Sequence, residues 1–347
     1  MTSEKKKDIR SLSIQDLRRF FTENQVKAFR ANQVYQWLWQ KGIHNFDGMT
    51  NLSKSTRALL KERFVINHID IDQQQKSRDG TIKNAVKLHD NLVVESVLIP
   101  TSRRTTACVS SQVGCSLDCK FCATAKIKRM RNLNADEIYD QVVAMDKQSR
   151  LYFDRPLSNI VFMGMGEPLM NYKNLINAVD KITNPEALGI SPSRIIVSTS
   201  GIPKMITKMA DDQVRFDLAI SLHSARQNIR EQLMPFAKKF PLEELTEAIQ
   251  YWYSKTSKPV TYEYVVWKGI NDQDEDIKAL VDFCKIIPSK VNLIEYNSIG
   301  DQEFLQAEKD RIEAYETSLE ANRIIVTVRR SRGNDIDAAC GQLANKS

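Results

Sequence analysis

Three cysteines near the middle of the chain have the spacing of a metal or cluster site. They are Cys115, Cys119 and Cys122, a C-x₃-C-x₂-C pattern on one short segment. A structural zinc site needs four ligands and usually takes them from two paired knuckles. A [4Fe–4S] cluster takes one thiolate per iron, so three cysteines would leave one iron open to a ligand from outside the protein. Buried core thiols and an incomplete zinc knuckle are the alternatives.

The other three cysteines have different surroundings. Cys340 lies between small residues near the C-terminus, a context suited to reactivity rather than to packing. Cys108 precedes the cysteine segment by seven residues and should lie near it in space. Cys284 follows an aromatic residue on a predicted helix and is expected in the core. Two cysteines, Cys108 and Cys340, are therefore left for chemistry.

A single carboxylate, Glu95, interrupts the apolar segment 93–99. Burying a carboxylate costs free energy unless it has a partner or faces a cavity. Glu95 is therefore either an outward-facing strand residue or a cavity residue. In a cavity, desolvation would raise its pKa and suit it to proton transfer.

Apolar strands and helices alternate every 30 to 40 residues from Thr101 onward. The predicted strands are 106–110, 159–163, 194–198, 216–221, 260–266, 291–296 and 323–329, and the predicted helices are 135–147, 175–182, 242–253, 274–286 and 308–320. This alternation indicates a parallel sheet, either doubly wound or an incomplete barrel of six units. Both architectures bind ligands at the carboxyl ends of the strands, and the cysteine segment follows the first of these strands.

Several predicted strands end in polar residues that could line one pocket. The segments are 164–168, 198–201, 221–224 and 296–297. They bring two glycines that let a backbone approach a ligand, a carboxylate that can accept from an ammonium group, small hydroxyls, an imidazole and an amide. Each of these residues alone is more often part of a turn than a ligand-binding residue. The prediction of a pocket therefore rests on their occurrence together at the ends of successive strands. His223 is a possible general base.

The chain before residue 101 divides in two. Residues 1–66 predict three short amphipathic helices, the first starting at Ser13. Trp37 and Trp39 point in nearly opposite directions on the second helix, so only one can be core. Residues 67–100 alternate with a period of two around a turn at Asp79-Gly80 and predict a β-hairpin extension. The expected domains are 1–66, 67–100 and 101–347.

Charge and composition limit the classes of function. The net charge is +7, and residues 1–66 hold 13 Lys or Arg against 6 Asp or Glu, while the remainder holds 37 of each. This local surplus suits a phosphate-backbone contact, or it is a solvated basic face. The sequence contains no run of 18 apolar residues, which predicts a protein without a membrane span. Its first residues are not followed by an apolar segment, which predicts that it has no export signal. Free cysteines in this setting favour the cytoplasm over a disulfide framework.

The cysteine spacing resembles the signature of the radical S-adenosylmethionine (SAM) superfamily. Four further segments, Cys108–Cys115, Met163–Pro168, Ser221–His223 and Arg332–Gly341, resemble the RlmN/Cfr group of radical-SAM RNA adenosine methyltransferases. The resemblance covers nearly the whole chain, and the N-terminal helical module favours the RlmN branch.

The resemblance implies a fold and a set of ligands. The fold would be α/β, an incomplete (β/α)6 radical-SAM barrel with a small N-terminal helical domain and a β-hairpin extension. Cys115, Cys119 and Cys122 would hold a [4Fe–4S] cluster, and two SAM molecules would be used per turnover. The residues that match SAM-binding positions are Gly166, Glu167, Ser198, Ser221, His223 and Asn297.

The resemblance also implies an activity, methylation of carbon 2 of adenosine in 23S rRNA and in tRNA next to the anticodon. Cys340 would first take a methyl group, Glu95 would accept a proton from the RNA adduct, and Cys108 would release the product by forming a disulfide with Cys340. An external electron donor such as flavodoxin and a monomeric enzyme are expected. The alternatives are Cfr-type methylation of carbon 8 and a non-methylating iron–sulfur RNA-binding protein.

Overall fold

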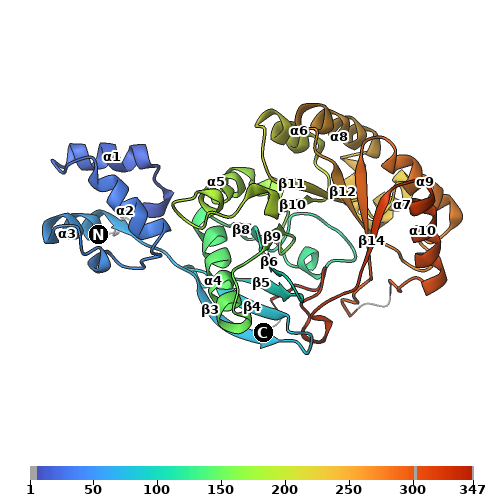
Figure 1. Ribbon diagram of the computed structural model, residues 1–347, viewed down its shortest axis with the longest axis horizontal. Helices are drawn as coiled ribbons and strands as arrows, with labels where there is room; N and C mark the ends of the chain where they lie inside the picture. The colour runs from blue at the N-terminus through green and yellow to red at the C-terminus, as the bar shows by residue number, and fades with distance from the viewer. Residues whose placement is uncertain (1–5, 301–302, 346–347) are drawn as a thin grey trace.

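The computed structural model describes residues 6–300 and 303–345, which form one large sheet covered by helices and a helical lobe at the N-terminal end (Figure 1). Within these residues the sheet has ten strands, in the order β14-β13-β12-β11-β10-β9-β6-β5-β4-β3. In this order, the strands from β14 to β6 run parallel to one another, and β6, β5, β4 and β3 pair antiparallel. The short strands β7 and β8 form a separate antiparallel pair. No helix in the described part of the chain has the length and apolar character needed to cross a bilayer.

Each parallel strand lies beside its neighbour in the chain, so the strand order never reverses. That order distinguishes an incomplete barrel from a doubly wound sheet. The fold expectation is therefore confirmed, with six strand–helix units followed by a final strand. The parallel strands are β6 (Thr105–Cys108), β9 (Asn159–Phe162), β10 (Ile195–Thr199), β11 (Asp217–Ser221), β12 (Val260–Val265), β13 (Ser289–Ile294) and β14 (Ile325–Arg329).

Helices cover the outer face of the parallel strands (Figure 1). They are α4 (Ala135–Phe153), α5 (Tyr172–Thr183), α6 (Pro203–Asp211), α7 (Gln227–Leu233), α8 (Leu242–Thr256), α9 (Asp274–Cys284) and α10 (Lys309–Ala321). The sequence analysis did not name α6 or α7. It also placed the end of β13 two residues too late, so that Glu295 to Asn297 lie in a loop beyond the strand.

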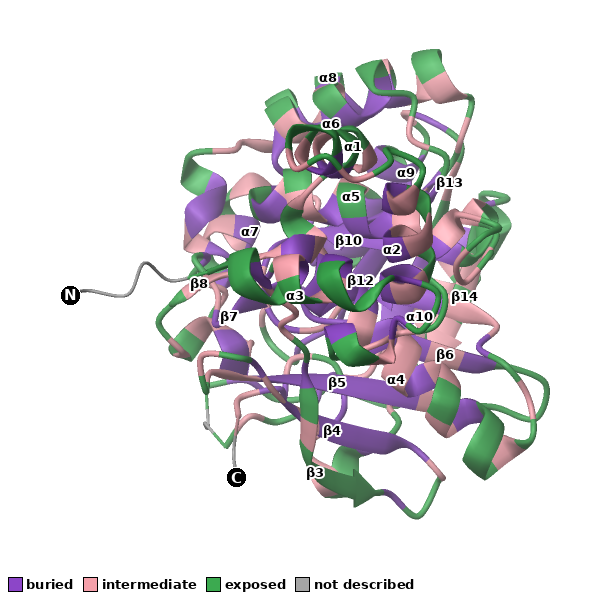
Figure 2. Cartoon of the chain, turned by 90° about the vertical axis from the view of Figure 1, so that its left-hand side faces the viewer, coloured by how far each residue is buried: buried purple, intermediate pink, exposed green. Residues whose placement is uncertain are grey.

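The antiparallel extension consists of β3 (Asp70–Lys76), β4 (Ile82–Lys87) and β5 (Val93–Pro100). The predicted turn at Asp79-Gly80 joins β3 to β4, with the Gly80 amide donating to the Ser77 carbonyl. Figure 2 shows β4 and β5 buried and β3 exposed at the sheet edge, as the side-chain pattern of each strand requires. The extension therefore continues the sheet beyond β6, the first parallel strand, and carries Glu95 on β5, its most buried strand.

The N-terminal lobe contains α1 (Ile14–Glu23), α2 (Arg30–Trp39) and α3 (Lys54–Arg63), with two-residue strands β1 (Lys7–Asp8) and β2 (Phe64–Val65). Ser13 and Asp16 form a capping box at the start of α1, as predicted. Trp39 is core and Trp37 is only partly buried, so the prediction that one of them faces inward is also confirmed.

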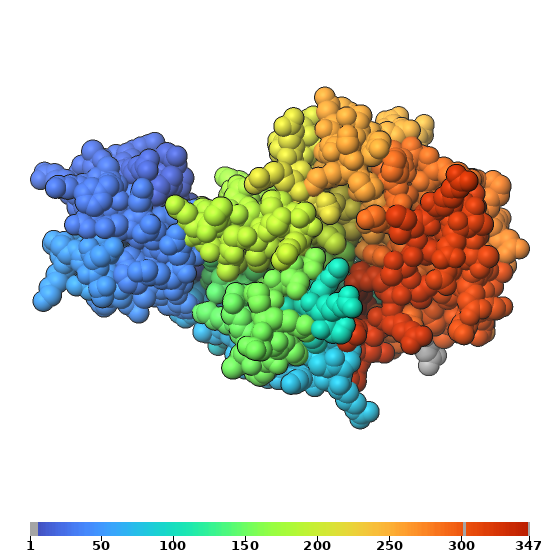
Figure 3. All heavy atoms as spheres, in the orientation of Figure 1, coloured from blue at the N-terminus to red at the C-terminus, as the bar shows by residue number. Residues whose placement is uncertain are grey.

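The lobe stands beside the barrel in Figure 3 and contacts it through α4. The Arg10 guanidinium lies 2.8 Å from an Asp140 oxygen and 3.1 Å from an Asp136 oxygen, with only 5% of its side chain exposed. The Trp39 ring packs edge-on against Tyr139, with the ring centroids 5.2 Å apart. A buried ion-pair cluster and an aromatic contact therefore join the lobe to the barrel.

Candidate active site

The cysteine segment forms a loop over the carboxyl ends of the parallel strands. It runs from β7 (Gln112–Val113) to the 3₁₀ helix η3 (Ala123–Lys126). The Asp118 carboxylate accepts a hydrogen bond from the Phe236 amide at 2.9 Å, and the Lys120 amide donates to the Leu233 carbonyl at 3.0 Å. These bonds fix the loop against the segment that follows α7.

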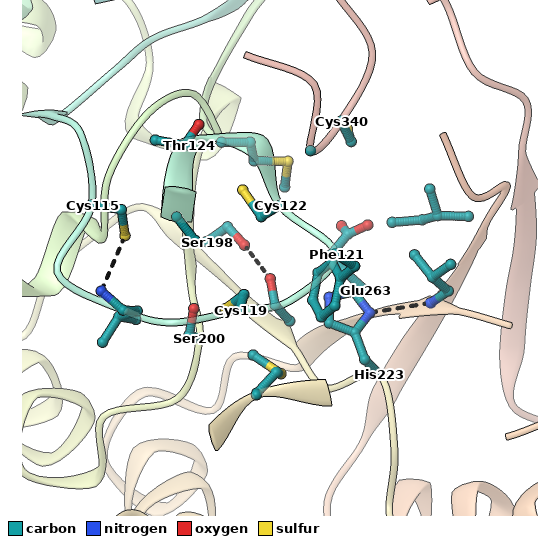
Figure 4. Close-up of a pocket in the computed structure, with 18 of the residues that line it drawn as sticks. Cys115, Cys119, Phe121, Cys122, Thr124, Ser198, Ser200, His223, Glu263 and Cys340 are labelled. Carbon is teal, nitrogen blue, oxygen red and sulfur yellow. Dashed lines mark hydrogen bonds between the residues drawn. The ribbon is translucent and has the colours of Figure 1, made fainter. Parts of the chain in front are cut away.

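The three loop cysteines line one cavity of about 170 Å³, here named the cysteine cavity (Figure 4). Burial raises the pKa of the Cys115 thiol to about 11. Burial also raises the pKa of Cys119, and the neighbouring Cys122 and Cys115 sulfurs raise it further. Ionising the Cys115 and Cys119 thiols therefore requires a nearby positive charge, which bound iron would supply.

The donor set fits a [4Fe–4S] cluster, because it offers three thiolates from one loop around one cavity. Such a cluster binds each thiolate to a different iron, unlike a zinc site, in which all ligands converge on one ion. In the part of the chain that the structure describes, no three His, Cys, Asp or Glu side chains are placed to hold a single metal ion.

All six residues that match SAM-binding positions line the cysteine cavity. They are Gly166, Glu167, Ser198, Ser221, His223 and Asn297. Gly166 has a φ of +92°, and a β-carbon built there would lie 2.4 Å from the Gln112 β-carbon. Only glycine fits this approach without displacing its neighbour. The structure thus brings the polar strand ends together, as the parallel alternation predicted.

Glu167 is buried, and backbone amides hold its carboxylate. Its Oε2 accepts from the Ser200 amide at 2.8 Å and its Oε1 from the Leu169 amide at 3.1 Å. Burial raises the pKa of this carboxyl, and the two hydrogen bonds oppose the rise. A fixed carboxylate in a cavity can accept from a cationic ammonium group.

His223 acts as a hydrogen-bonding group rather than as a base. Its Nδ1 accepts from the Val265 amide at 3.2 Å, which leaves the ring proton on Nε2. Burial, with a smaller contribution from the Arg230 charge, lowers the pKa of His223 to about 3. The ring is therefore neutral at physiological pH and a poor general base, so the general-base role considered from the sequence is not supported.

The sequence analysis missed three further residues of this cavity, Glu263, Trp267 and Glu295. Glu263 lies inside β12, and burial raises its pKa. Its Oε2 lies 3.5 Å from a guanidinium nitrogen of Arg329 at the end of β14. A carboxylate inside an apolar strand is the same signal that marked Glu95, so Glu263 could have been found by the same rule.

A second cavity of about 310 Å³, here named the arginine cavity, adjoins the first. Cys108 and Cys340 both line it, and Cys340 lines the cysteine cavity as well. The Asn297 side chain donates to the Cys340 carbonyl at 3.3 Å, and the Gly341 carbonyl accepts from the Ala123 amide at 2.7 Å. The C-terminal segment is thus bound to the cysteine loop, with Cys340 between the two cavities.

Cys108 and Cys340 are both free thiols in this structure, as are the other four cysteines. Burial raises the pKa of Cys108 to about 12, and Cys340 adds to the rise. Cys340 is an exposed residue, yet desolvation of its thiol between the two cavities raises its pKa, whereas the Arg329 guanidinium lowers it. Cys284 is a buried core residue of α9, as expected.

Glu95 is buried and lines neither cavity. Its Oε1 lies 3.3 Å from the Lys83 ammonium, and its Oε2 accepts from the Ala344 and Asn345 amides at 2.8 and 3.2 Å. Val97 on β5 pairs with Cys108 on β6, so their side chains lie on the same face of the sheet. Glu95 is two residues from Val97 and therefore shares that face with Cys108. The C-terminal tail therefore lies between Glu95 and the arginine cavity, which the adjacent Leu343 lines.

Comparison with known proteins places this fold and site in one class. The sequence model of the radical SAM superfamily matches residues 109–283, and that of the ribosomal RNA large subunit methyltransferase N-terminal domain matches residues 7–66. The crystal structure of a radical SAM methyltransferase from Sphaerobacter thermophilus is 36% identical, with a TM-score of 0.89 over 97% of this chain and 99% of that one. The fold and the cysteine loop are those of a radical SAM enzyme, a class that uses a [4Fe–4S] cluster and SAM.

Curated relatives narrow the class. Proteins described as probable dual-specificity RNA methyltransferase RlmN are 68% identical in Christiangramia forsetii, over 99% of this chain and 98% of the relative, and 69% identical in Flavobacterium psychrophilum, over 98% of each. The corresponding protein of Bacillus velezensis is 39% identical over 97% of this chain and 93% of its own. The chain belongs to the RlmN family of RNA methyltransferases, and it is a SAM-dependent enzyme that acts on RNA.

Proposed function

We propose that the enzyme methylates carbon 2 of adenosine in 23S rRNA, at the peptidyl-transferase centre, and in tRNA next to the anticodon. The observation that carries the proposal is the position of Cys340, which lines both the cavity of the cluster cysteines and the cavity of Cys108. A residue there can collect a methyl group on one side and deliver carbon to RNA on the other.

The chemistry of the target explains why a methylated cysteine is needed. Carbon 2 of adenine lies between two ring nitrogens and is electron-poor, so it does not attack the electrophilic methyl group of SAM. A radical route avoids this obstacle. Cys115, Cys119 and Cys122 would hold a [4Fe–4S] cluster, which when bound would supply the electron for the reductive cleavage of SAM.

Cys340 performs the first step as an ordinary nucleophile. Its thiolate attacks the methyl carbon of one SAM, which leaves S-methylcysteine and S-adenosylhomocysteine. Arg329 favours the thiolate, because its positive charge lowers the pKa of Cys340 against the effect of burial. After a hydrogen atom is removed from the S-methyl group with a second SAM, the resulting carbon radical adds to carbon 2 of adenine. The adduct radical would return one electron to the cluster, which leaves Cys340 bonded through that carbon to adenine.

Glu95 and Cys108 complete the reaction. Glu95 accepts the proton that carbon 2 must lose, and the Cys108 sulfur then attacks the Cys340 sulfur. The bond between the Cys340 sulfur and the transferred carbon breaks as a disulfide forms. The electron pair of that bond stays on the carbon, which takes up a proton from solvent and remains on adenine as a methyl group. The disulfide is transient, and external reduction returns both thiols; an electron donor such as flavodoxin and a monomeric enzyme complete the proposal.

The test is anaerobic turnover with methyl-labelled SAM and two unmodified substrates, a 23S rRNA fragment and a tRNA. We expect labelled 2-methyladenosine in both, identified by nucleoside analysis. Cys340→Ala should give none, whereas Cys284→Ala, at a buried core cysteine outside both cavities, should retain activity. Labelled 8-methyladenosine would show the Cfr-type reaction, and no labelled nucleoside with the wild-type enzyme would refute the proposal.

A further inference from the structure

The two cavities that meet at Cys340 differ in charge. Three carboxylates, Glu167, Glu263 and Glu295, line the cysteine cavity, with no Lys or Arg among its described residues. Three arginines, Arg329, Arg330 and Arg332, line the arginine cavity, and its described residues include no Asp or Glu. SAM carries a net positive charge and RNA a negative one, so each cavity has the sign that one substrate requires.

Two of the three arginines have little to bind within the protein. Arg329 is paired with Glu263. Among the described residues, the Arg330 side chain has no hydrogen-bond or ion-pair partner, and the Arg332 guanidinium makes one contact, at 3.5 Å, to the Asp79 carbonyl. Arginine is the side chain best suited to phosphate, because its planar group offers paired N–H donors.

A buried hydroxyl between these arginines is also without a partner. The Ser331 Oγ is shielded from solvent and makes no hydrogen bond, while the Ser331 amide donates to a Glu295 oxygen at 3.0 Å. A buried hydroxyl without a partner costs free energy. A phosphate oxygen in the cavity would satisfy it.

Hydrogen bonds to the turn between β3 and β4 hold the segment that carries the arginines. The Gly333 amide donates to the Asp79 carboxylate at 3.0 Å, and the Asp335 carboxylate accepts from the Ser77 hydroxyl at 2.6 Å. These bonds attach the segment to the β3–β4 turn, which brings a further exposed arginine, Arg78. Arg330 and Arg332 are therefore exposed residues of a segment that is hydrogen-bonded to the β3–β4 turn and that lines the arginine cavity.

We propose that Arg330, Arg332 and the Ser331 hydroxyl bind the backbone phosphate next to the target adenosine, while its base lies in the arginine cavity beside Cys340 and Cys108. The inference rests on the proposed function and adds to it a phosphate subsite. Enzymes that act on a base take it out of the stack, and the phosphates on either side of a flipped base stay within one nucleotide of it. A phosphate at the rim thus fixes how deeply the base enters.

The test compares an Arg330→Gln/Arg332→Gln double variant with the wild type and with Arg194→Gln. Arg194 is exposed and lies just before β10, at the opposite end of the parallel strands. The dissociation constant of a 23S rRNA fragment is measured over a salt series. We expect it to rise about a hundredfold at the lowest salt, about tenfold for each charged hydrogen bond. The plot of log affinity against log salt concentration should become shallower, its slope decreasing in magnitude by about 1 to 2.

Two further measurements separate a phosphate subsite from a structural role. An Arg330→Lys/Arg332→Lys variant should recover the salt slope while remaining weaker than the wild type, because lysine restores charge without the paired donors. RNA with one uncharged methylphosphonate, placed 5′ or 3′ of the target, should bind the wild type less well. At one of these two positions, the methylphosphonate should not weaken RNA binding by the Gln double variant any further, because the side chains that contact that phosphate are already absent.

Additive losses at both positions, or an unchanged dissociation constant and salt slope in the Gln double variant, would overturn the subsite. A loss of equal size in Arg194→Gln would do the same, since the effect would then be one of total charge. If the wild type binds RNA with the predicted coupling but forms no 2-methyladenosine, the proposed reaction fails while the phosphate subsite stands.

Discussion

Replacing Cys108 by Ala should trap the enzyme on its RNA. Without Cys108 the carbon bridge between Cys340 and adenine can still form, but the thiol that attacks the Cys340 sulfur is missing. The covalent species should therefore accumulate toward one RNA per enzyme. It would appear on a denaturing gel as a shifted band that nuclease treatment removes. Cys340→Ala should give no such band, and Cys284→Ala should behave as the wild type.

The pKa of Cys108 gives the rate of release its pH dependence. Only the thiolate attacks a sulfur effectively. Burial raises the Cys108 pKa to about 12, so roughly one molecule in ten thousand is ionised at pH 8. The ionised fraction, and with it the rate of wild-type adduct decay, should rise about tenfold per pH unit from pH 7 to pH 10. A cysteine with the usual pKa of about 8.5 would instead level off near pH 9.

The assay is single-turnover decay of the gel-shifted species over that pH range. Glu95→Gln should slow this decay at every pH without preventing adduct formation, because carbon 2 must lose its proton before the bond to sulfur breaks. Normal turnover by Cys108→Ala with no trapped RNA would show that the two-cysteine release is wrong. A decay rate that levels off near pH 9 would refute the buried-thiol argument while leaving the two-cysteine release intact.

Three further changes test the parts of the fold that support the site. Cys119→Ala should lose most of the bound iron and the reductive cleavage of SAM, and full iron content would contradict the cluster assignment. Gly166→Ala places a methyl group 2.4 Å from a neighbouring β-carbon at a φ of +92°; it should cost about 2–4 kcal/mol of stability in thermal unfolding and weaken SAM binding. Arg10→Ala leaves the buried Asp136 and Asp140 without their shared cation and should cost about 3–5 kcal/mol. We expect that loss as an early unfolding transition of the N-terminal lobe, which an unchanged melting curve would exclude.

The sequence predicted the parts of the fold that follow from local pattern. The alternation of apolar strands and helices indicated parallel strands, and the rule that ligands lie at their carboxyl ends placed the polar segments on one pocket. It could not decide between an incomplete barrel and a doubly wound sheet, because strand order depends on pairing between distant segments. The short helix α7 was missed because a helix of seven residues shows too little periodicity.

The site was predicted incompletely for a related reason. Glu263 and Arg329 lie near the cysteines in space but far from them in the chain. A carboxylate inside an apolar strand makes Glu263 unusual without indicating which site it belongs to, and Arg329 carries no motif of its own. The resemblance identified Glu95 as a proton acceptor, yet no sequence pattern indicated that the C-terminal tail would bind it. Contacts between segments more than 200 residues apart, such as Ala344 with Glu95, require the folded structure.

The tail over Glu95 has a consequence for the order of the proposed steps. Methyl transfer to Cys340 needs the cysteine cavity and Cys340, so it can proceed while the Ala344 and Asn345 amides still occupy Glu95. The proposed proton transfer from adenine to Glu95 cannot proceed in that state, because the Ala344 and Asn345 amides occupy the carboxylate that the adenine must reach. The proposed reaction therefore requires the tail to move when the RNA enters. The Lys83 ammonium, 3.3 Å from Glu95 Oε1, does not depend on the tail and would remain beside the carboxylate after the two amides leave.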